Sequence, residues 1–257
     1  MLRFDHLVIA VRDLECAFAE FRDVLGFDAQ MGGRHEAFGT RNAIIRFGLD
    51  YLELISVEDE RLALQSSRGA LVRFLAEHEV GLCAYAVATD DLDSLASLAL
   101  QVGIDPTGPF AMNRRRPDGS RLSWRLLVPG GDQYFQMWPF FIQWDQPDSE
   151  RMKMERAGKH PNGSVRVSGI EIGVSDPRPA DAWYQSMGVE SVSGFQRLLI
   201  EDPMEGPRAV TLRVQDLRAT RDWYRSRSLQ LEPAPGMPDR LCLMDGPLPR
   251  ALYFTTV

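Results

Sequence analysis

The clearest structural signal in the chain lies close to its start and reads Asp5-His6-Leu7-Val8-Ile9-Ala10-Val11-Arg12-Asp13-Leu14. Its first part is rich in β-branched and other apolar side chains, which is typical of a β-strand. Asp13 then stands where a helix N-cap belongs, because its carboxylate can accept a backbone N–H that the first helical turn leaves unpaired. Apolar residues follow at helical spacing at Leu14, Phe18, Phe21 and Leu25, so the stretch predicts a strand followed by a helix.

The same plan occurs in three later segments, which begin with residues 83–92, 169–177 and 210–217. Each copy has a β-rich run, an Asp at the predicted N-cap and a helical stretch. In three of the four copies a Gly closes the helix, as expected at a left-handed C′ position. Self-similarity of this kind indicates one supersecondary unit that is used four times.

Further β-rich segments follow the first two predicted helices. Residues 42–47 and 51–57 form one pair, and residues 121–128 and 133–138 form another, each pair separated by a turn. The first two copies therefore predict two β-α-β-β-β modules. An extra helix at about 69–78 is predicted to join them.

The repeat also suggests how the chain divides into domains. Residues 1–145 hold the two long copies, residues 146–165 are rich in Pro, Gly and charge and read as a linker, and residues 166–257 hold two shorter copies. The positions that correspond to His6 in the shorter copies are Gly169 and about Ala209, neither of which carries a reactive side chain. We therefore expect the functional site in the first domain and a structural role for the second.

Composition narrows the function classes. The chain has 257 residues, 44% of them apolar and 25% charged, with a net charge of −7, which disfavours binding to a nucleic-acid backbone. Cys16, Cys83 and Cys242 are far apart and predict neither a zinc knuckle nor a disulfide framework. No apolar run reaches the roughly 20 residues that span a membrane, and the start lacks a signal-peptide pattern. These features fit a reduced protein of the cytoplasm.

A set of short motifs carries a resemblance to a known family. They are Asp5 to Leu14, Gly32-Gly33-Arg34-His35, Gly39-Thr40, Asn42-Ala43, Tyr51-Leu52-Glu53-Leu54-Ile55, Arg116-Pro117-Asp118-Gly119, Trp124-Arg125 and Pro139-Phe140-Phe141-Ile142-Gln143-Trp144. Over residues 3–145 the chain resembles the vicinal-oxygen-chelate superfamily, and within it the glyoxalase-like domain group. The resemblance implies an α+β fold in which pairs of modules form curled mixed sheets around a cup. Relatives include isomerases, lyases, epimerases, ring-cleaving dioxygenases and proteins that only sequester drugs, so the fold alone does not give the function.

Strand alternation predicts which side chains face this cup. We assume that the more apolar row of each strand packs against helices and that the other row faces inward. The inward side chains are then His6, Asn42, Arg46, Tyr51, Glu53, Ser123, Arg125, Tyr134, Gln136 and Trp138. Because buried polar groups need partners, so polar a face indicates a hydrated or ligand-filled site.

The resemblance assigns metal ligands to part of this face. His6 and Glu53 match the two ligands that the first module supplies in metal-binding relatives, and Gln136 lies where the second module supplies a carboxylate or amide. An imidazole and a carboxylate suit Zn, Ni, Mn or Fe. The fourth position falls on Leu82, Cys83 or Ala84, none of which is His. The alternatives are that His6 is a core histidine bonded to Glu53, or that Glu53 is a general base in a metal-free pocket.

The remaining polar residues suggest how a substrate is held. Arg46 and Arg125 favour an anionic molecule, because a guanidinium binds carboxylate or phosphate through two parallel hydrogen bonds, although either could instead form a structural ion pair. His35, in the glycine-rich segment, is a candidate acid/base or substrate anchor at the rim, or an ordinary loop histidine. Asn42, Ser123, Tyr134 and Trp138 complete the predicted substrate-binding residues, with packing as the alternative for the Trp.

Two functions remain open at this point. The first is an enzyme that acts on a small, anionic, oxygen-rich metabolite by metal-assisted isomerase, lyase or dioxygenase chemistry, with Glu53 or His35 moving a proton. The second is a metal-free protein that binds or sequesters a small molecule in the same cup without catalysis. With either function we expect a monomer or homodimer.

Overall fold

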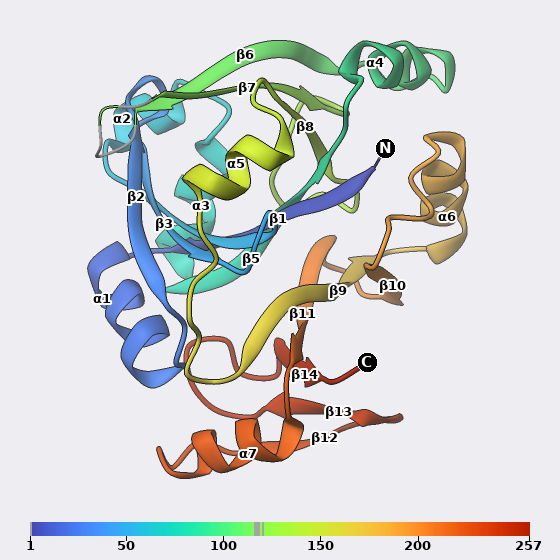
Figure 1. The fold of residues 1–257 in the computed structure, drawn as a ribbon. Coiled ribbons are helices and arrows are strands. Elements are labelled where there is room, and N and C mark those ends of the chain that lie inside the picture. The colour runs from blue at the N-terminus through green and yellow to red at the C-terminus, as the bar shows by residue number, and fades with distance from the viewer. Residues whose placement is uncertain (1, 116–118, 120) are drawn as a thin grey trace.

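The structure is a computed structural model that describes residues 2–115, 119 and 121–257, and it contains two curled sheets flanked by helices (Figure 1). The first sheet has eight strands in the order β2-β3-β4-β1-β5-β8-β7-β6. The second has six strands in the order β10-β9-β11-β14-β13-β12. The predicted α+β fold with two pairs of repeated modules is confirmed.

The first module follows the predicted plan. It consists of β1 (Arg3–Val11), α1 (Leu14–Ala19), β2 (Ala29–His35), β3 (Thr40–Arg46) and β4 (Tyr51–Val57), with a π-helical turn η1 (Glu20–Val24) after α1 and a 3-10 turn η2 (Glu36–Phe38) before β3. Asp13 caps α1, since its carboxylate accepts the N–H of Cys16 at 2.9 Å. β1 and β4 are parallel, which places Val8 beside Glu53.

The second module departs from the prediction in its last strand. It consists of β5 (Val80–Ala88), α4 (Leu92–Gln101), β6 (Thr107–Arg115), β7 (Arg121–Val128) and β8 (Phe140–Trp144). The strand predicted at 133–138 was wrong, because this segment consists of bends, and Phe135 has a φ of 57°, in the left-handed region that interrupts a regular strand. The chain turns there, and β8 begins only at Phe140, which lies beside Ala86 of the parallel strand β5.

Three helices lie between or after these modules. The helix predicted at 69–78 is confirmed as α3 (Gly69–Glu77), preceded by the short α2 (Glu60–Leu64). α5 (Asp148–Met154) lies inside the predicted linker, and its Arg151 is fully buried. Within the described part of the chain, no helix combines the length and apolar character needed to cross a membrane.

The second sheet contains the third and fourth copies. Its elements are β9 (Ser164–Val174), α6 (Pro177–Ser186), β10 (Gln196–Glu201), β11 (Gly206–Val214), α7 (Leu217–Arg225), β12 (Leu231–Ala234), β13 (Met237–Leu243) and β14 (Leu252–Thr255). Asp176 and Asp216 accept backbone N–H groups at the starts of α6 and α7, at 3.0 and 2.7 Å. The N-cap residues that define the repeat are therefore used as predicted.

Two separate clusters of buried residues show which faces of the sheets are packed and which face forms a cup. The larger one joins the outer faces of both sheets to α1, α4, α6 and α7, and within it β11 lies against β5. The smaller one lies on the inner, concave side of the first sheet, where Leu71 and Leu75 of α3 pack against Ala10 and Cys83. The two halves thus share one core on the convex side, and the concave side of the first sheet is left to form a cup.

Candidate functional site

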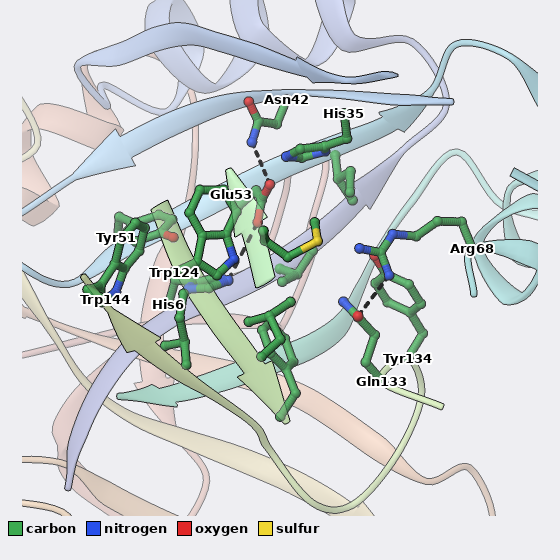
Figure 2. Close-up of a pocket in the computed structure, with 16 residues that line it drawn as sticks. His6, His35, Asn42, Tyr51, Glu53, Arg68, Trp124, Gln133, Tyr134 and Trp144 are labelled. Carbon is green, nitrogen blue, oxygen red and sulfur yellow. Dashed lines mark hydrogen bonds and ion pairs between the residues drawn. The ribbon is translucent and has the colours of Figure 1, made fainter. Parts of the chain in front are cut away.

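The cup of the first sheet holds a pocket whose empty space, counted together with its open mouth, is about 540 Å³. Figure 2 shows its polar side chains on two sides of the space. The lining residues are His6, Val8, His35, Asn42, Tyr51, Glu53, Ile55, Arg68, Met112, Trp124, Leu126, Gln133, Tyr134, Phe140, Ile142 and Trp144.

One side of the cavity carries the polar residues predicted for the first module. His6 of β1 and Glu53 of β4 have their Nε2 and Oε2 atoms 3.5 Å apart, and their residues are only 4% and 9% exposed. Asn42 donates to Oε1 of Glu53 at 2.5 Å and accepts the N–H of Gly33 at 2.8 Å. Gly32 must be glycine for this contact, because a Cβ there would lie 2.0 Å from the Asn42 side-chain oxygen. His35 lies at the same rim, bonded to Thr40 at 3.0 Å.

Asp5 fixes the orientation of the His6 ring. It is the extra residue of a β-bulge, since Phe4 pairs with Val87 and His6 with Ala86, and bulges redirect side chains in this way. His6 donates from Nδ1 to Asp5 Oδ1 at 2.8 Å. Burial alone would raise the pKa of Asp5, but the hydrogen bond from His6 and the charges of Arg151 and Arg3 outweigh it and hold the pKa well below its ordinary value.

The proton on Nδ1 leaves the other nitrogen of His6 to face the cavity. Nε2 is therefore an acceptor in the neutral ring and a donor when the ring is protonated. Glu53 lies beside Nε2, so the cavity wall contains two adjacent groups that can each carry a proton. The arrangement can accept a proton from a bound molecule and return one to it.

A ring of buried charges supports this pair from behind. Tyr51 stacks on His6 with ring centroids 4.5 Å apart, and the guanidinium of Arg46 lies 4.5 Å from the Tyr51 ring. Arg46 pairs with Glu155 at 2.9 Å, Glu155 with Arg151 at 3.5 Å, and Arg151 with Asp5 at 3.6 Å. Arg46, predicted to grip a substrate anion, does not line the cavity and is instead part of this ring.

The other predicted arginine also lies elsewhere. Arg125 of β7 pairs with Asp93 of α4 at 3.1 Å and donates to Gln143 at 2.7 Å, on the outer side of the sheet. Ser123 lies on that same outer face of the strand, whereas Trp124 and Leu126 line the cavity. The inward and outward rows of β7 were therefore predicted the wrong way round. The reason is that the cup face of the second module is itself apolar, so the more apolar row of β7 lines the cup and the row with Ser123 and Arg125 faces outward.

The remaining predicted residues lie in the turn at 129–139, which places their side chains in different surroundings. Tyr134 lines the cavity, and burial raises the pKa of its hydroxyl. Gln136 donates to the backbone oxygen of Tyr134 at 3.3 Å and does not line the cavity. Trp138 packs against Trp183 of α6, with ring centroids 5.6 Å apart, so it serves packing between the two halves.

The cavity has a cation that the sequence patterns did not single out. Arg68 precedes α3, is 5% exposed and donates to Gln133 at 2.7 Å. Its guanidinium lies 4.7 Å from the ring of Phe38 and 5.3 Å from that of Tyr134. Figure 2 shows it across the space from Glu53. Arg68 lies in a loop, so no strand or helix periodicity predicts where its side chain points. The only sequence signal that could have identified it is an arginine in a short run of small polar residues.

The donor set does not fit the metal site that the resemblance implies. Aligned by the repeat, Ala84 takes the place of His6 and Phe140 that of Glu53, in agreement with the pairing of Ala86 with Phe140. Cys83 donates to the backbone oxygen of Val8 at 3.4 Å, and burial raises the pKa of its thiol well above its usual value. Among the described residues, no group of three or more His, Cys, Asp or Glu side chains is placed to hold a metal ion. His6 and Glu53 therefore form half of such a site.

Comparisons with known proteins support the fold assignment. The model of the glyoxalase-like domain family matches residues 4–188, and the chain belongs to this family. A hypothetical protein from Staphylococcus aureus has a similar structure, with 19% identity, a TM-score of 0.71 and 99% of both chains covered.

Two enzymes of known activity have related structures. A variant of 4-hydroxymandelate synthase from Streptomyces coelicolor has 15% identity and a TM-score of 0.60, with 98% of this chain and 91% of that chain covered. Methylmalonyl-CoA epimerase from the same organism has 21% identity and a TM-score of 0.41, with 56% of this chain and 98% of that chain covered. For the Staphylococcus aureus protein and the synthase, at 19% and 15% identity, the likeness concerns the fold alone. No curated protein matches the sequence.

Proposed function

We propose that this glyoxalase-like protein is an enzyme that transfers a proton to and from a small molecule bound in the cup of its first sheet. The observation that carries the proposal is the pair His6 and Glu53. Their facing atoms are 3.5 Å apart, both line the cavity, and Asp5 holds the His6 ring with Nε2 toward the ligand.

The pair supports chemistry in two half-steps. One group takes a proton from the ligand, and the neighbouring group delivers a proton to another atom or another face of it. Asn42 supports Glu53 by donating to its second oxygen, which leaves Oε2 toward His6. Many isomerase and lyase reactions, two of the types expected from the resemblance, begin with such a transfer. No step of this proposal passes through a metal, because the described residues of the second module supply no ligand.

The experiment measures the exchange of a C–H proton of the test compound for deuterium from the solvent. Purified protein in D₂O is incubated with small carboxylic acids that carry a C–H next to a carbonyl, and proton NMR measures loss of that signal. We expect catalysed exchange for at least one compound, with a loss of about 10²–10⁴-fold in His6→Gln and in Glu53→Gln. Glu171→Gln, on the second sheet, is the matched control and should retain the wild-type rate.

A binding function without catalysis is the second candidate. It is supported by the apolar part of the lining, where Trp124, Leu126, Phe140 and Ile142 offer a surface for a hydrophobic ligand. Compounds that bind in the cavity without any exchange, in wild type and variants alike, would favour this candidate over the enzyme.

A further inference from the structure

Arg68 is a buried cation with an unusual set of partners. It is 5% exposed and lines the cavity, yet within the described residues it forms no ion pair with an Asp or Glu. Its Nη1 donates to the side-chain oxygens of Gln133 at 2.7 Å and Ser67 at 3.1 Å, both neutral groups. Its Nε is buried and has no hydrogen-bond partner among those residues. A buried charge without a counter-ion is costly, which calls for an explanation.

The other buried arginines of the first domain show the contrast. Arg46 lies 2.9 Å from Glu155, and Arg151 lies between Asp5 and Glu155 at 3.6 and 3.5 Å. Both are thereby neutralised within the protein. Arg68 is different because no described Asp or Glu pairs with it.

The surroundings of Arg68 position its guanidinium without neutralising it. The rings of Phe38 and Tyr134 lie 4.7 and 5.3 Å from it, and Gln133 holds one of its nitrogens. A planar guanidinium held in this way is prepared for an acceptor with two oxygens. Glu53 does not fill that role, because it lies on the other side of the space, bonded to Asn42 (Figure 2).

We propose that Arg68 binds the carboxylate of the ligand, so that the cavity takes a small organic carboxylate. The apolar lining formed by Trp124, Leu126 and Phe140 then contacts the body of the molecule, and the proton-transfer pair lies across from the carboxylate. One guanidinium suits a singly charged carboxylate better than a phosphate, which carries more charge and takes more donors. This inference rests on the proposed function only in using the same cavity.

The test measures binding rather than turnover. Benzoate and 2-oxobutyrate are titrated against the full-length protein, each beside its neutral amide, with tryptophan fluorescence as the readout because Trp124 and Trp144 line the cavity. We expect at least one carboxylate to bind at least tenfold more tightly than its amide. Arg68→Met should abolish that preference, Arg68→Lys should restore part of it, and Arg125→Gln, which alters the outward-facing arginine, should leave it unchanged.

Thermal melting separates a binding role from a structural one. Removal of an unpaired buried charge should leave the melting temperature of Arg68→Met equal to or above that of the wild type. A large drop, comparable to that of Arg151→Met, would mean that Arg68 is structural and would overturn the proposal. Equal affinity for carboxylate and amide, or no binding of either carboxylate, would also overturn it, as would preferential binding of inorganic phosphate.

The two proposals can fail separately. Binding that depends on Arg68 without any proton exchange would refute the enzyme and leave the carboxylate site intact. Proton exchange that depends on His6 and Glu53 but not on Arg68 would refute the carboxylate site and leave the enzyme proposal intact.

Discussion

Asp5 and Arg151 form an ion pair in which both side chains are fully buried, with Arg151 Nη1 3.6 Å from Asp5 Oδ2. The two residues are far apart in sequence, one in the bulge of β1 and the other in α5. Trp144 donates to the same Asp5 oxygen at 2.9 Å, and the Arg151 guanidinium lies 3.8 Å from the Trp144 ring. The orientation of His6 therefore depends on a helix outside the two modules that form the cup.

Loss of the Arg151 charge should be severely destabilising. Arg151→Met leaves Asp5 and Glu155 buried without their shared cation, and removal of one partner of a buried pair costs about 3–5 kcal/mol. We expect a drop of that size in the free energy of unfolding, measured with urea and circular dichroism. Arg178→Met removes an exposed pair with Asp176 and should change stability by less than about 1 kcal/mol. Equal effects of the two changes would refute a special role for the buried pair.

Asp5 should also affect stability in acid. Because its folded pKa lies below the ordinary value of 3.8, the unfolded chain takes up a proton first as the pH falls. The stability that Asp5 contributes is thus present above about pH 3.8 and is lost as the pH falls through the folded pKa. We expect the stability difference between wild type and Asp5→Asn to be larger at pH 6 than at pH 3. The exposed Asp93→Asn serves as control, and a constant difference would contradict the expectation.

His160 predicts an effect of pH near neutrality. It accepts the N–H of Asp28 at 3.0 Å through Nδ1 and donates to the backbone oxygen of Arg46 at 3.0 Å through Nε2, so it joins the segment after α5 to the first sheet in its neutral form. Burial lowers its pKa below 6.5. Because the unfolded state then binds more protons, stability should fall as the pH drops from about 6.5 toward the folded pKa. His160→Gln keeps a donor and an acceptor and should remove this slope, as read from melting temperatures between pH 7 and 5.

The half-site for metal can be completed by mutation. Ala84→His with Phe140→Glu would place an imidazole and a carboxylate opposite His6 and Glu53, giving four protein ligands. We expect this double variant to bind Zn²⁺ or Ni²⁺ at least tenfold more tightly than the wild type by calorimetry, with one ion per chain. Tight binding of one metal ion by the wild type would show instead that His6 and Glu53 need no ligand from the second module.

The first module could be predicted closely from the sequence, and the second could not. In β1 and β4 the cup row contains His6, Tyr51 and Glu53, so polar residues marked the inner face correctly. In β7 the inner row is Trp124 and Leu126, and an apolar row was taken to pack on helices. Alternation shows that a strand has two rows but not which row faces the cup, and the assumption that the more apolar row packs on helices fails where the cup face is itself apolar.

The residues around the site that were not predicted from the sequence were missed for a different reason. Asp5 reaches His6 only through the β-bulge at Phe4 and His6, and regular alternation would send the two side chains to opposite faces. Arg68, Arg151 and Glu155 lie in segments without a repeating pattern, and their contacts are with residues distant in sequence. Only the folded chain brings them to the cup.

The place of α5 also determines how this protein could be divided by engineering. A fragment that stops at residue 145 would contain every strand of the cup but would lack Arg151 and Glu155, so buried Asp5 would lose its buried cation and buried Arg46 would lose its carboxylate partner. The smallest portable unit that carries the His6 centre therefore runs to Glu155, ten residues past the boundary suggested by the strand pattern. Any chimera that grafts this cup onto another second half would have to bring α5 with it.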